Sequence, residues 1–313
     1  MDASIIIINW NTRDLLIECI NSVYSTTQGI NFDIWVVDNG SSDGSVQALR
    51  ELFPDVKVIE NQSNLGFAKA CNQALKLMES KFAVLLNSDT ILTDGAIKTV
   101  LDTMEKDPDI GLCGAQLLNS DGTKQNSIAN TPSLATELLN KSLLRRLFPQ
   151  KYPGKERDFA EPIEVESIIG AFMAVGKKAI DKVGMLDESY FFFFEETDWC
   201  IRMKKKGWKV VHHPGAKVYH LQGQTVRKIN IRARIEYWKS RYLFFKKNYG
   251  RTTFAVLLIG LMIKLLGNLI LNLLLTCGSA FTNKKAVEKS KLYLNILYWH
   301  LLGLPEGRGL STR

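Results

Sequence analysis

Two carboxylates stand directly after short apolar runs of the sequence. Asp38 ends the run FDIWVVD, and Asp89 lies three residues beyond the run FAVLL. A carboxylate in the first position can accept hydrogen bonds from a heterocyclic ring N–H and a ribose hydroxyl, or it can cap an Asx-type turn. A carboxylate in the second position can hold one divalent cation that bridges two phosphates, or it can cap the next helix. Each motif taken alone leaves both interpretations open.

A third candidate is the acidic group at residues 195–198 (EETD), which directly follows the aromatic run at 190–194 (YFFFF). Carboxylates beside an apolar wall are partly desolvated and repel one another, which raises one pKa and produces a usable general base. The same acids would also compensate the dipole at a helix N-terminus. His220 is the fourth candidate, either as a metal ligand paired with Asp89 or as an ordinary surface or core histidine.

The elements that position these residues alternate between strands and helices. Apolar runs predict strands over residues 4–9, 32–38, 56–60 and 82–86, and the segments between them predict helices over 12–24, 46–52 and 67–78. This alternation predicts a parallel, doubly wound sheet with right-handed crossovers. Such sheets bind ligands at the carboxyl ends of their strands, where the polar clusters stand at residues 9–11 (NWN), 38–39 (DN) and 87–89 (NSD).

Beyond residue 110 the pattern becomes less regular. Strands are expected over residues 111–118 and 167–175, with a long polar insertion between them that contains Pro132, Pro149, Pro153 and the basic pair Arg145-Arg146. We interpret the insertion as a mobile segment over the site. A helix is predicted over 195–206, because this segment opens with acids and closes with lysines. Short strands are predicted over 210–211 and 217–220.

The composition excludes several classes of protein. The 313 residues are 46% apolar and 23% charged, which are ordinary globular values. Five cysteines, an odd number without a CxxC pair, argue against a disulfide framework or a structural zinc site. The start carries Asp2 where a signal peptide carries a base, and the apolar run after it is too short for a signal sequence. We therefore expect the bulk of the protein to be cytoplasmic.

The net charge of +8 conceals a strong asymmetry. Residues 1–200 hold 18 Lys/Arg and 29 Asp/Glu, whereas residues 201–313 hold 22 and 3. The second part favours an anionic partner, either phospholipid or nucleic acid. Residues 232–249 interleave bases and aromatics, and residues 254–281 carry one charge, Lys264. An apolar stretch of this length suits a membrane, and no nucleic-acid module requires it.

The apolar stretch can be accommodated in more than one way. A polar stripe recurs every four residues along it, at Gly260, Lys264, Asn268, Asn272 and Thr276. A helix with such a stripe can lie in the membrane surface, cross the membrane with the stripe against a partner helix, or pack on the enzyme body. Bases on both sides of the stretch disfavour a single pass, so in-plane or re-entrant attachment is preferred.

Taken together, the motifs resemble those of family 2 glycosyltransferases, whose fold is called GT-A. The matching segments, in order, are NWN (9–11), VVDNGSSDGS (36–45), NLGFAKACN (64–72), LLNSDT (85–90), the stretch 170–208 that contains GAFMAVG and FFFFEETDW, and AKVYH (216–220). The resemblance covers roughly residues 4–225. Within the family, the sequence most resembles the bacterial rhamnosyltransferases of cell-surface polysaccharide synthesis.

The resemblance implies a Rossmann-like GT-A domain over residues 1–225, the α/β fold of the nucleotide-diphospho-sugar transferases. Its mixed sheet is flanked by helices, with a nucleotide-sugar half (1–118) and an acceptor half (119–225). Residues 226–313 then form a basic, apolar helical region that associates with a membrane.

The same resemblance assigns roles to individual residues. Asp38 binds the base of the nucleotide-sugar, and Asp89 is the last acid of the family's DxD motif, with Asn87 in place of the first. His220 is the second ligand of a divalent cation, Mg²⁺ or Mn²⁺, or a ligand of the diphosphate. Glu196 or Asp198 is the catalytic base. Further implied contacts are made to the nucleotide-sugar by Asn9, Asn11, Asn39, Asn64, Gly66, Phe67 and Asn72, and on the acceptor side by Gly170, Ala171, Glu195 and Trp199.

The implied reaction is inverting transfer of a sugar from a nucleotide-sugar to a lipid-linked or polysaccharide acceptor, in O-antigen or cell-wall polysaccharide synthesis. Rhamnose from dTDP-rhamnose is the first expectation, and GlcNAc, glucose or galactose from a UDP donor is the alternative. The anionic membrane surface is an expected partner and nucleic acid is not. The enzyme is then expected on the cytoplasmic face of the cell membrane, peripherally or through its apolar helix. The sequence leaves the oligomeric state open, and a homo-oligomer is one possible state.

A different class of protein, a non-catalytic membrane scaffold with the same fold, is the second hypothesis. It would explain Asn87 and Glu196 as decay of the family motifs. The joint retention of four site residues argues against it, namely Asp38, Asp89, Asp198 and His220. A Rossmann dehydrogenase is excluded because no GxGxxG follows the first strand.

Overall fold

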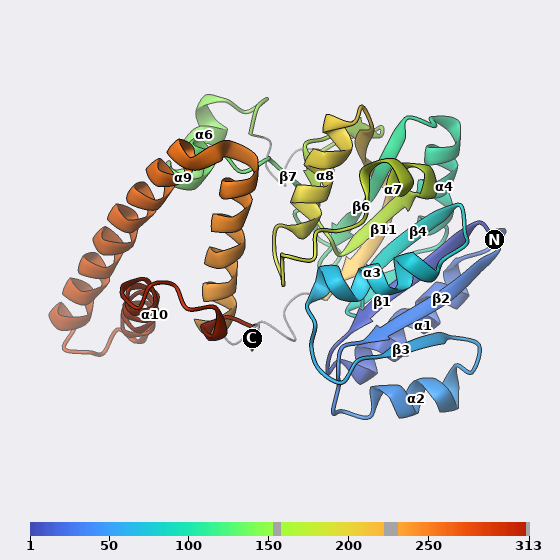
Figure 1. The fold of residues 1–313 in the computed structure, drawn as a ribbon, viewed down its shortest axis with the longest axis horizontal. Helices are drawn as coiled ribbons and strands as arrows, with labels where there is room; N and C mark the ends of the chain where they lie inside the picture. The colour runs from blue at the N-terminus through green and yellow to red at the C-terminus, as the bar shows by residue number, and fades with distance from the viewer. Residues whose placement is uncertain (153–157, 222–230, 311–313) are drawn as a thin grey trace. The chain divides into compact units, whose positions relative to one another are not determined.

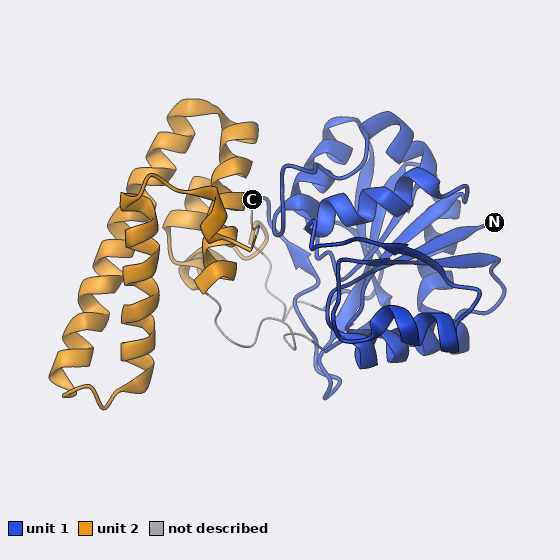
Figure 2. Ribbon diagram, turned by 60° about the horizontal axis from the view of Figure 1, so that its bottom comes forward, with its two compact units in different colours: residues 1–131, 153–225 blue, residues 132–152, 226–313 orange. Residues whose placement is uncertain are grey.

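The computed structural model describes residues 1–152, 158–221 and 231–310. The chain divides into two compact units, unit 1 with residues 1–131 and 153–225, and unit 2 with residues 132–152 and 226–313 (Figure 2). Pro153 and the predicted boundary between residues 225 and 226 lie outside the described residues. The insertion 132–152, which the sequence assigns to the acceptor half of the first domain, belongs to unit 2.

Unit 1 is built on a mixed sheet with the strand order β3-β2-β1-β4-β10-β6-β11-β5, and β8 also pairs with β11 (Figure 1). Neighbours among β1 to β4 are parallel, whereas β10 runs antiparallel to β4 and β6. The strands of this sheet are β1 (Ala3–Asn9), β2 (Phe32–Asp38), β3 (Lys57–Glu60), β4 (Phe82–Asn87), β5 (Thr90–Leu92), β6 (Ile110–Leu118), β8 (Ile163–Glu164), β10 (Phe172–Gly176) and β11 (Lys209–His220). Strands β7 (Ile128–Ala129) and β9 (Ser167–Ile168) pair separately.

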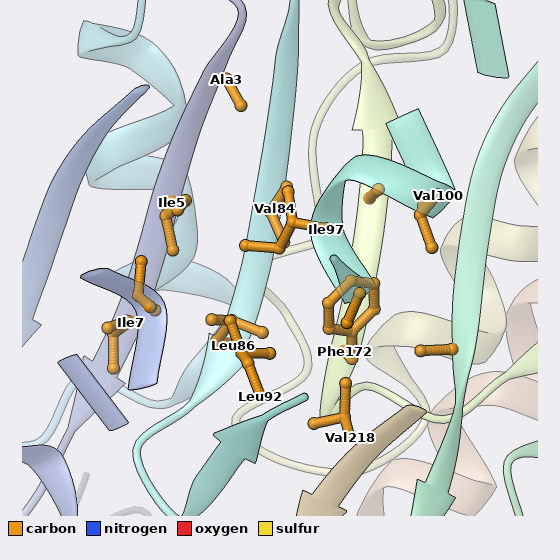
Figure 3. Packing of buried hydrophobic residues seen from close by; sticks show 14 of the residues in the cluster. Ala3, Ile5, Ile7, Val84, Leu86, Leu92, Ile97, Val100, Phe172 and Val218 are labelled. Carbon is orange, nitrogen blue, oxygen red and sulfur yellow. The ribbon is translucent and has the colours of Figure 1, made fainter. Parts of the chain in front are cut away.

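Two apolar layers cover the sheet because successive side chains of a strand point to opposite faces. Ile5 and Ile7 of β1 pack in one core with residues of α1, α2 and α4, and Ile6 packs in the other with residues of α3, α7 and α8. Figure 3 shows the first core, where Val84, Phe172 and Val218 come from three different strands. The helices of unit 1 are α1 (Arg13–Thr26), α2 (Ser45–Leu52), α3 (Phe67–Leu77), α4 (Ala96–Lys106), α7 (Lys177–Val183) and α8 (Glu195–Lys205).

The structure confirms the predicted mixed α/β sheet flanked by helices and corrects the bounds of some strands. The four parallel strands and three helices predicted up to residue 86 are present, each with bounds close to those expected. The predicted strand 167–175 is instead two strands, β9 and β10, and β10 is antiparallel to its neighbours. The two short strands predicted near residues 210 and 217 form one strand, β11, with a register shift between His213 and Lys217. Apolar runs indicate burial, but they carry no information on strand direction.

Unit 2 is helical, with α5 (Leu134–Leu138), α6 (Lys141–Leu147), α9 (Ile231–Gly278), α10 (Lys284–Leu301) and a 3₁₀ turn (Glu306–Arg308). Helix α9 contains a kink at Gly250, whose φ of 78° is not helical. Among the described residues, α9 is the one helix that is long and apolar enough to cross a membrane. Helices α9 and α10 pack together, with Leu257, Leu261 and Leu265 buried on α9.

The polar stripe of α9 faces other elements of unit 2. A Cβ added at Gly260 would lie 2.7 Å from Leu138 of α5, and Lys264 Nζ donates to the carbonyl O of Glu137 at 3.0 Å. Thr276 lies 3.4 Å from the hydroxyl of Ser290 on α10. Residues 132–152, part of the insertion that was interpreted from sequence as a mobile segment over the site, therefore pack on α9 through Glu137 and Leu138.

Candidate active site

The carboxyl ends of β1, β2 and β4 bring the first polar cluster together. Asn9 pairs in register with Asp38, and Ile8 pairs with Asn87, so the three strand ends are adjacent. Asn9 Nδ2 donates to Asp38 Oδ2 at 2.8 Å. Thr12 directly precedes α1, but its side chain does not cap the helix. Its hydroxyl donates to Asn9 Oδ1 at 2.7 Å and also lies 2.7 Å from the Ser88 hydroxyl. One hydrogen-bonded chain thus links the three strand ends.

Asp38 is 2% exposed, and its second oxygen accepts from the backbone N–H of Ser41 at 2.8 Å. An ionised carboxylate has about four lone-pair positions. Each oxygen therefore keeps capacity for another donor, while the protein contacts fix its orientation. Asn11 has a positive φ of 54°. Its side-chain oxygen accepts from the Ser42 N–H, in the loop after β2, at 2.8 Å.

Hydrogen bonds from asparagine side chains fix the loop before α3. Asn39 is buried, accepts from Asn61 Nδ2 at 3.0 Å and donates to the Gly66 carbonyl at 3.3 Å. Asn64 Oδ1 accepts from the Gly66 N–H at 2.9 Å. These contacts hold the residues from Asn64 to Phe67 beside the end of β2, which is where the sequence predicts part of the nucleotide-sugar pocket.

Gly66 joins this loop to the aromatic run. Its φ is +87°, and an added Cβ would lie 2.4 Å from the carbonyl O of Phe191. The N–H of Phe67 donates to that same carbonyl at 2.8 Å. Phe193 and Phe194 both have positive φ, 72° and 70°, directly before α8 begins. The backbone that leads into the acidic group is therefore strained, and α3 holds it in place.

Replacing Gly66 by alanine is expected to lower both stability and activity. The positive φ alone costs about 1–3 kcal/mol for a residue with a Cβ, and the clash must displace Phe191 and the start of α8. Gly95→Ala is the matched control, since Gly95 has φ of +68° and nothing within 4 Å of its added Cβ. Melting temperatures and kcat should show that Gly95→Ala lowers only stability. Equal kcat in both variants would show that the Gly66–Phe191 contact does not position the site.

Several predicted site residues are placed inside the fold. The amide of Asn72 is 2% exposed, donates to the Leu186 carbonyl and to Glu188, and accepts from the Leu186 N–H. Trp199 is 0% exposed and donates to the Gly184 carbonyl at 2.8 Å. Asn72 and Trp199 thus fix the segment between α7 and α8. Glu195 is buried, and its charge adds to the effect of burial in raising the pKa of the Cys71 thiol on α3.

Asp89 and His220 come together as the sequence predicts. His220 Nε2 lies 3.4 Å from Asp89 Oδ1 and 3.5 Å from Asn87 Nδ2. Its other ring nitrogen, Nδ1, lies 3.1 Å from Gln125 Oε1. Because Gln125 Nε2 donates to the His220 carbonyl at 2.5 Å, its Oε1 is the atom left to accept from Nδ1–H. The ring is thereby held with Nε2 facing Asp89.

One carboxylate oxygen and one imidazole nitrogen, with the second ring nitrogen fixed by a hydrogen bond, are a donor set that fits a divalent cation. Among the residues described, no group of three or more His, Cys, Asp and Glu side chains is placed to hold a metal. Asp89 and His220 therefore suit a cation whose other ligands are substrate phosphates and water. Gln125 was not found from sequence, because its role depends on a contact 95 residues away.

Glu196 and Asp198 differ sharply in environment. Asp198 is 4% exposed and accepts from Arg202 Nε at 2.7 Å, while Arg202 also donates to two backbone carbonyls. Glu196 Oε2 is buried and has no hydrogen-bond partner among the described residues. Burial raises the pKa of the Glu196 carboxyl above its ordinary value. Of the two acids, Glu196 has the character of a base.

Glu196 stands at the same edge of the sheet as the strand ends. The Asn87 N–H donates to the Ala171 carbonyl at 3.1 Å, which places the residues before β10 next to the end of β4. A Cβ added at Gly170 would lie 3.7 Å from the Glu196 side chain. Gly170 therefore lies directly beside the Glu196 side chain, whereas Ala171 is 1% exposed and contributes its backbone.

This fold has solved counterparts in complex with nucleotides or nucleotide-sugars. The structure of GalNAc-T7 with UDP, GalNAc and Mn²⁺ matches with a TM-score of 0.57 and 15% identity, over 78% of this chain and 50% of that chain. A mannosyltransferase from Pyrobaculum calidifontis, in complex with GDP-Man and Mn²⁺, matches with a TM-score of 0.56 and 14% identity, over 96% of this chain and 86% of that one. These likenesses establish a GT-A fold.

The family follows from the sequence match. Residues 4–184 match the model of glycosyl transferase family 2, so the chain belongs to this family and is a glycosyltransferase. The N-acetylglucosaminyl-diphospho-decaprenol L-rhamnosyltransferase of Mycobacterium tuberculosis is 26% identical over 232 residues, 69% of this chain and 75% of the relative. The family predicted from the motifs is confirmed, and a distant rhamnosyltransferase is among its relatives.

Proposed function

We propose that the enzyme transfers a sugar, with inversion at the anomeric carbon, from a nucleoside-diphosphate sugar to a lipid-linked saccharide. The observation that carries this proposal is Glu196 Oε2, a buried carboxylate oxygen that has no hydrogen-bond partner among the described residues and belongs to a half-buried side chain beside Gly170. A carboxyl of raised pKa in this position suits a general base.

In the proposed reaction, Glu196 takes the proton of an acceptor hydroxyl while that oxygen bonds to the anomeric carbon. The bond from this carbon to the diphosphate oxygen breaks on the opposite face, and the nucleoside diphosphate departs with the electron pair. The transition state has oxocarbenium character, as in glycosidases. Asp38, oriented by Asn9 and Ser41, would hold the nucleoside end of the donor.

Asp89 and His220 would hold Mg²⁺ or Mn²⁺ at the diphosphate. The bound cation supplies charge that stabilises the leaving group. Gln125 keeps the His220 ring in the orientation and tautomer that a ligand needs, and Asn87 remains a hydrogen-bond donor beside it. The Mn²⁺ in both matched glycosyltransferase structures supports this assignment.

We propose dTDP-rhamnose as the first donor to test, with UDP-linked GlcNAc, glucose or galactose as alternatives. The name of the mycobacterial relative, an N-acetylglucosaminyl-diphospho-decaprenol L-rhamnosyltransferase, supports both rhamnose and a polyprenyl-diphosphate acceptor. The apolar half of α9 and the bases around it support a location on the cytoplasmic face of the membrane, where such an acceptor is accessible.

A thermal-shift panel tests the donor class. The purified protein is mixed with dTDP, UDP, GDP or NAD, each with and without Mn²⁺. A ligand that binds the native state raises the melting temperature, by about 2.7 kcal/mol of stability at 100 times its Kd. We expect a metal-dependent shift with dTDP, and a shift with UDP instead would select the alternative donors. If folded protein responds to no nucleotide, the proposal fails and the scaffold hypothesis takes its place.

A further inference from the structure

The insertion 132–152 is clamped to α9 by buried polar contacts. Arg241 and Glu137 are 6% and 7% exposed and form an ion pair with Arg241 Nη1 3.1 Å from Glu137 Oε2. Lys264 Nζ donates to the Glu137 carbonyl, and Tyr249 Oη donates to the Pro132 carbonyl at 2.5 Å. Arg241, before the kink in α9, thus contacts the side chain of Glu137 in α5, and Lys264, after the kink, contacts its backbone carbonyl.

Beyond this clamp, α6 presents an apolar face to solvent. Leu143 and Leu147 are one turn apart and are 53% and 59% exposed, and Leu139 and Phe148 beside the helix ends are 54% and 55% exposed. Leu144 points inward and is 7% exposed. The remaining faces carry exposed bases, namely Lys141, Arg145 and Arg146. A short helix with an exposed leucine face and flanking bases has the composition of an interfacial membrane helix.

The exposed apolar residues of α6 belong to a larger set within the same unit. Unit 2 also exposes large apolar side chains along α9 and after it, among them Val256, Ile259, Ile263, Ile270, Leu274 and Phe281. Its sequence holds 20 Lys/Arg and 4 Asp/Glu, whereas unit 1 holds 20 and 28. Exposed leucines with an excess of bases in one unit favour an anionic lipid surface over a second copy, since two copies of so basic a unit repel each other.

We propose that the insertion 132–152 is a second membrane-contacting element, in which α6 lies in the headgroup–acyl boundary of an anionic bilayer through Leu139, Leu143, Leu147 and Phe148. The insertion follows β7, which pairs with β9, and β9 ends two residues before Gly170. The inference rests on the proposed attachment of α9 to a membrane, so its test must separate the two.

Site-specific fluorescence provides that separation. Cys277 is exposed and the other four cysteines are buried, so Cys277→Ser gives a background for single labels. An environment-sensitive NBD group is then attached to one new cysteine in each of four variants. These are Leu143→Cys on the apolar face of α6, Arg145→Cys on its basic face, Leu274→Cys on α9 and Lys98→Cys on unit 1. Each labelled protein is titrated with vesicles of phosphatidylglycerol and phosphatidylethanolamine, and with vesicles of phosphatidylcholine alone.

We expect an emission increase of several fold and a blue shift at positions 143 and 274 with the anionic vesicles, less at 145, and none at 98. Quenching by doxyl lipids should follow the same order. A response at 274 without one at 143 would overturn the inference and leave the attachment of α9 intact. No response at either position would remove both. A response at 143 that needs no lipid and grows with protein concentration would identify a second copy as the occupant and overturn the inference.

Discussion

Glu196→Gln is expected to reduce kcat by about 10²–10⁴-fold, which is the usual contribution of a positioned general base. The amide keeps the size of the side chain but cannot take the acceptor proton. Donor binding should persist, because Glu196 belongs neither to the Asn9–Asp38 network nor to the Asp89–His220 pair. Steady-state kinetics with the donor identified by thermal shift would measure the loss, and the nucleotide-induced rise in melting temperature would verify the binding.

Asp198→Asn decides between the two candidate bases. This change weakens the contact to Arg202, a hydrogen bond between charged groups that is worth about 1.5–3 kcal/mol, so we expect a lower melting temperature and a kcat within a few fold of wild type. The opposite outcome, a large loss of kcat in Asp198→Asn and little in Glu196→Gln, would assign the base to Asp198.

The pH dependence follows from the raised pKa of Glu196. A base must be deprotonated, so kcat/KM should rise with pH through an apparent pKa above that of an ordinary glutamate. The same shift affects stability with a defined sign. The folded state binds this proton more tightly than the unfolded state, so wild type loses stability relative to Glu196→Gln as pH rises above the unfolded pKa of Glu. The two melting temperatures should converge in acid. A gap that does not change with pH would contradict the raised pKa.

The grouping of polar residues at the strand ends could be predicted because it follows from the order of the strands. Asn9, Asp38 and Asp89 each follow a buried run, and the rule that ligands bind at the carboxyl ends of strands brings them together without any knowledge of side-chain contacts. Glu196 was predicted as one of two bases, but sequence could not decide between them. The decision depends on Arg202, which is one helical turn from Asp198 and pairs with it.

The parts that escaped prediction depend on contacts between distant residues. Gln125 lies in a polar turn after β6 with no local signal, and only the return of β11 places it against His220. The helices of the insertion had a readable signal, since Ser133 caps α5 and Asn140 caps α6 through their side chains. The prolines near both ends of the segment, Pro132 and Pro149, instead favoured its interpretation as a loop. Which unit the insertion joins was unpredictable, because the partner of Glu137 is Arg241, 104 residues away.

Asp89→Asn is expected to lower kcat/KM by about 10²–10³-fold, comparable to the loss of one strong electrostatic contact in a transition state. The amide has the same shape, and the backbone contact from the Leu221 N–H to the Asp89 carbonyl is retained. The lost negative charge removes the preferred ligand of a hard cation. Titration of Mn²⁺ in the presence of the nucleoside diphosphate, followed by calorimetry and by activity, would measure the effect.

Two further variants make the metal prediction specific. Asp94→Asn removes an exposed acid five residues away and should leave both the Mn²⁺ titration and kcat/KM unchanged. Gln125→Leu keeps both proposed ligands but frees the His220 ring, and should weaken Mn²⁺ affinity by about 10–100-fold, as the loss of an outer-shell partner does. Because excess metal restores a site whose ligands remain, Gln125→Leu should recover activity at high Mn²⁺ while Asp89→Asn should not. Full activity of Asp89→Asn without added metal would show that the leaving diphosphate is stabilised by other groups.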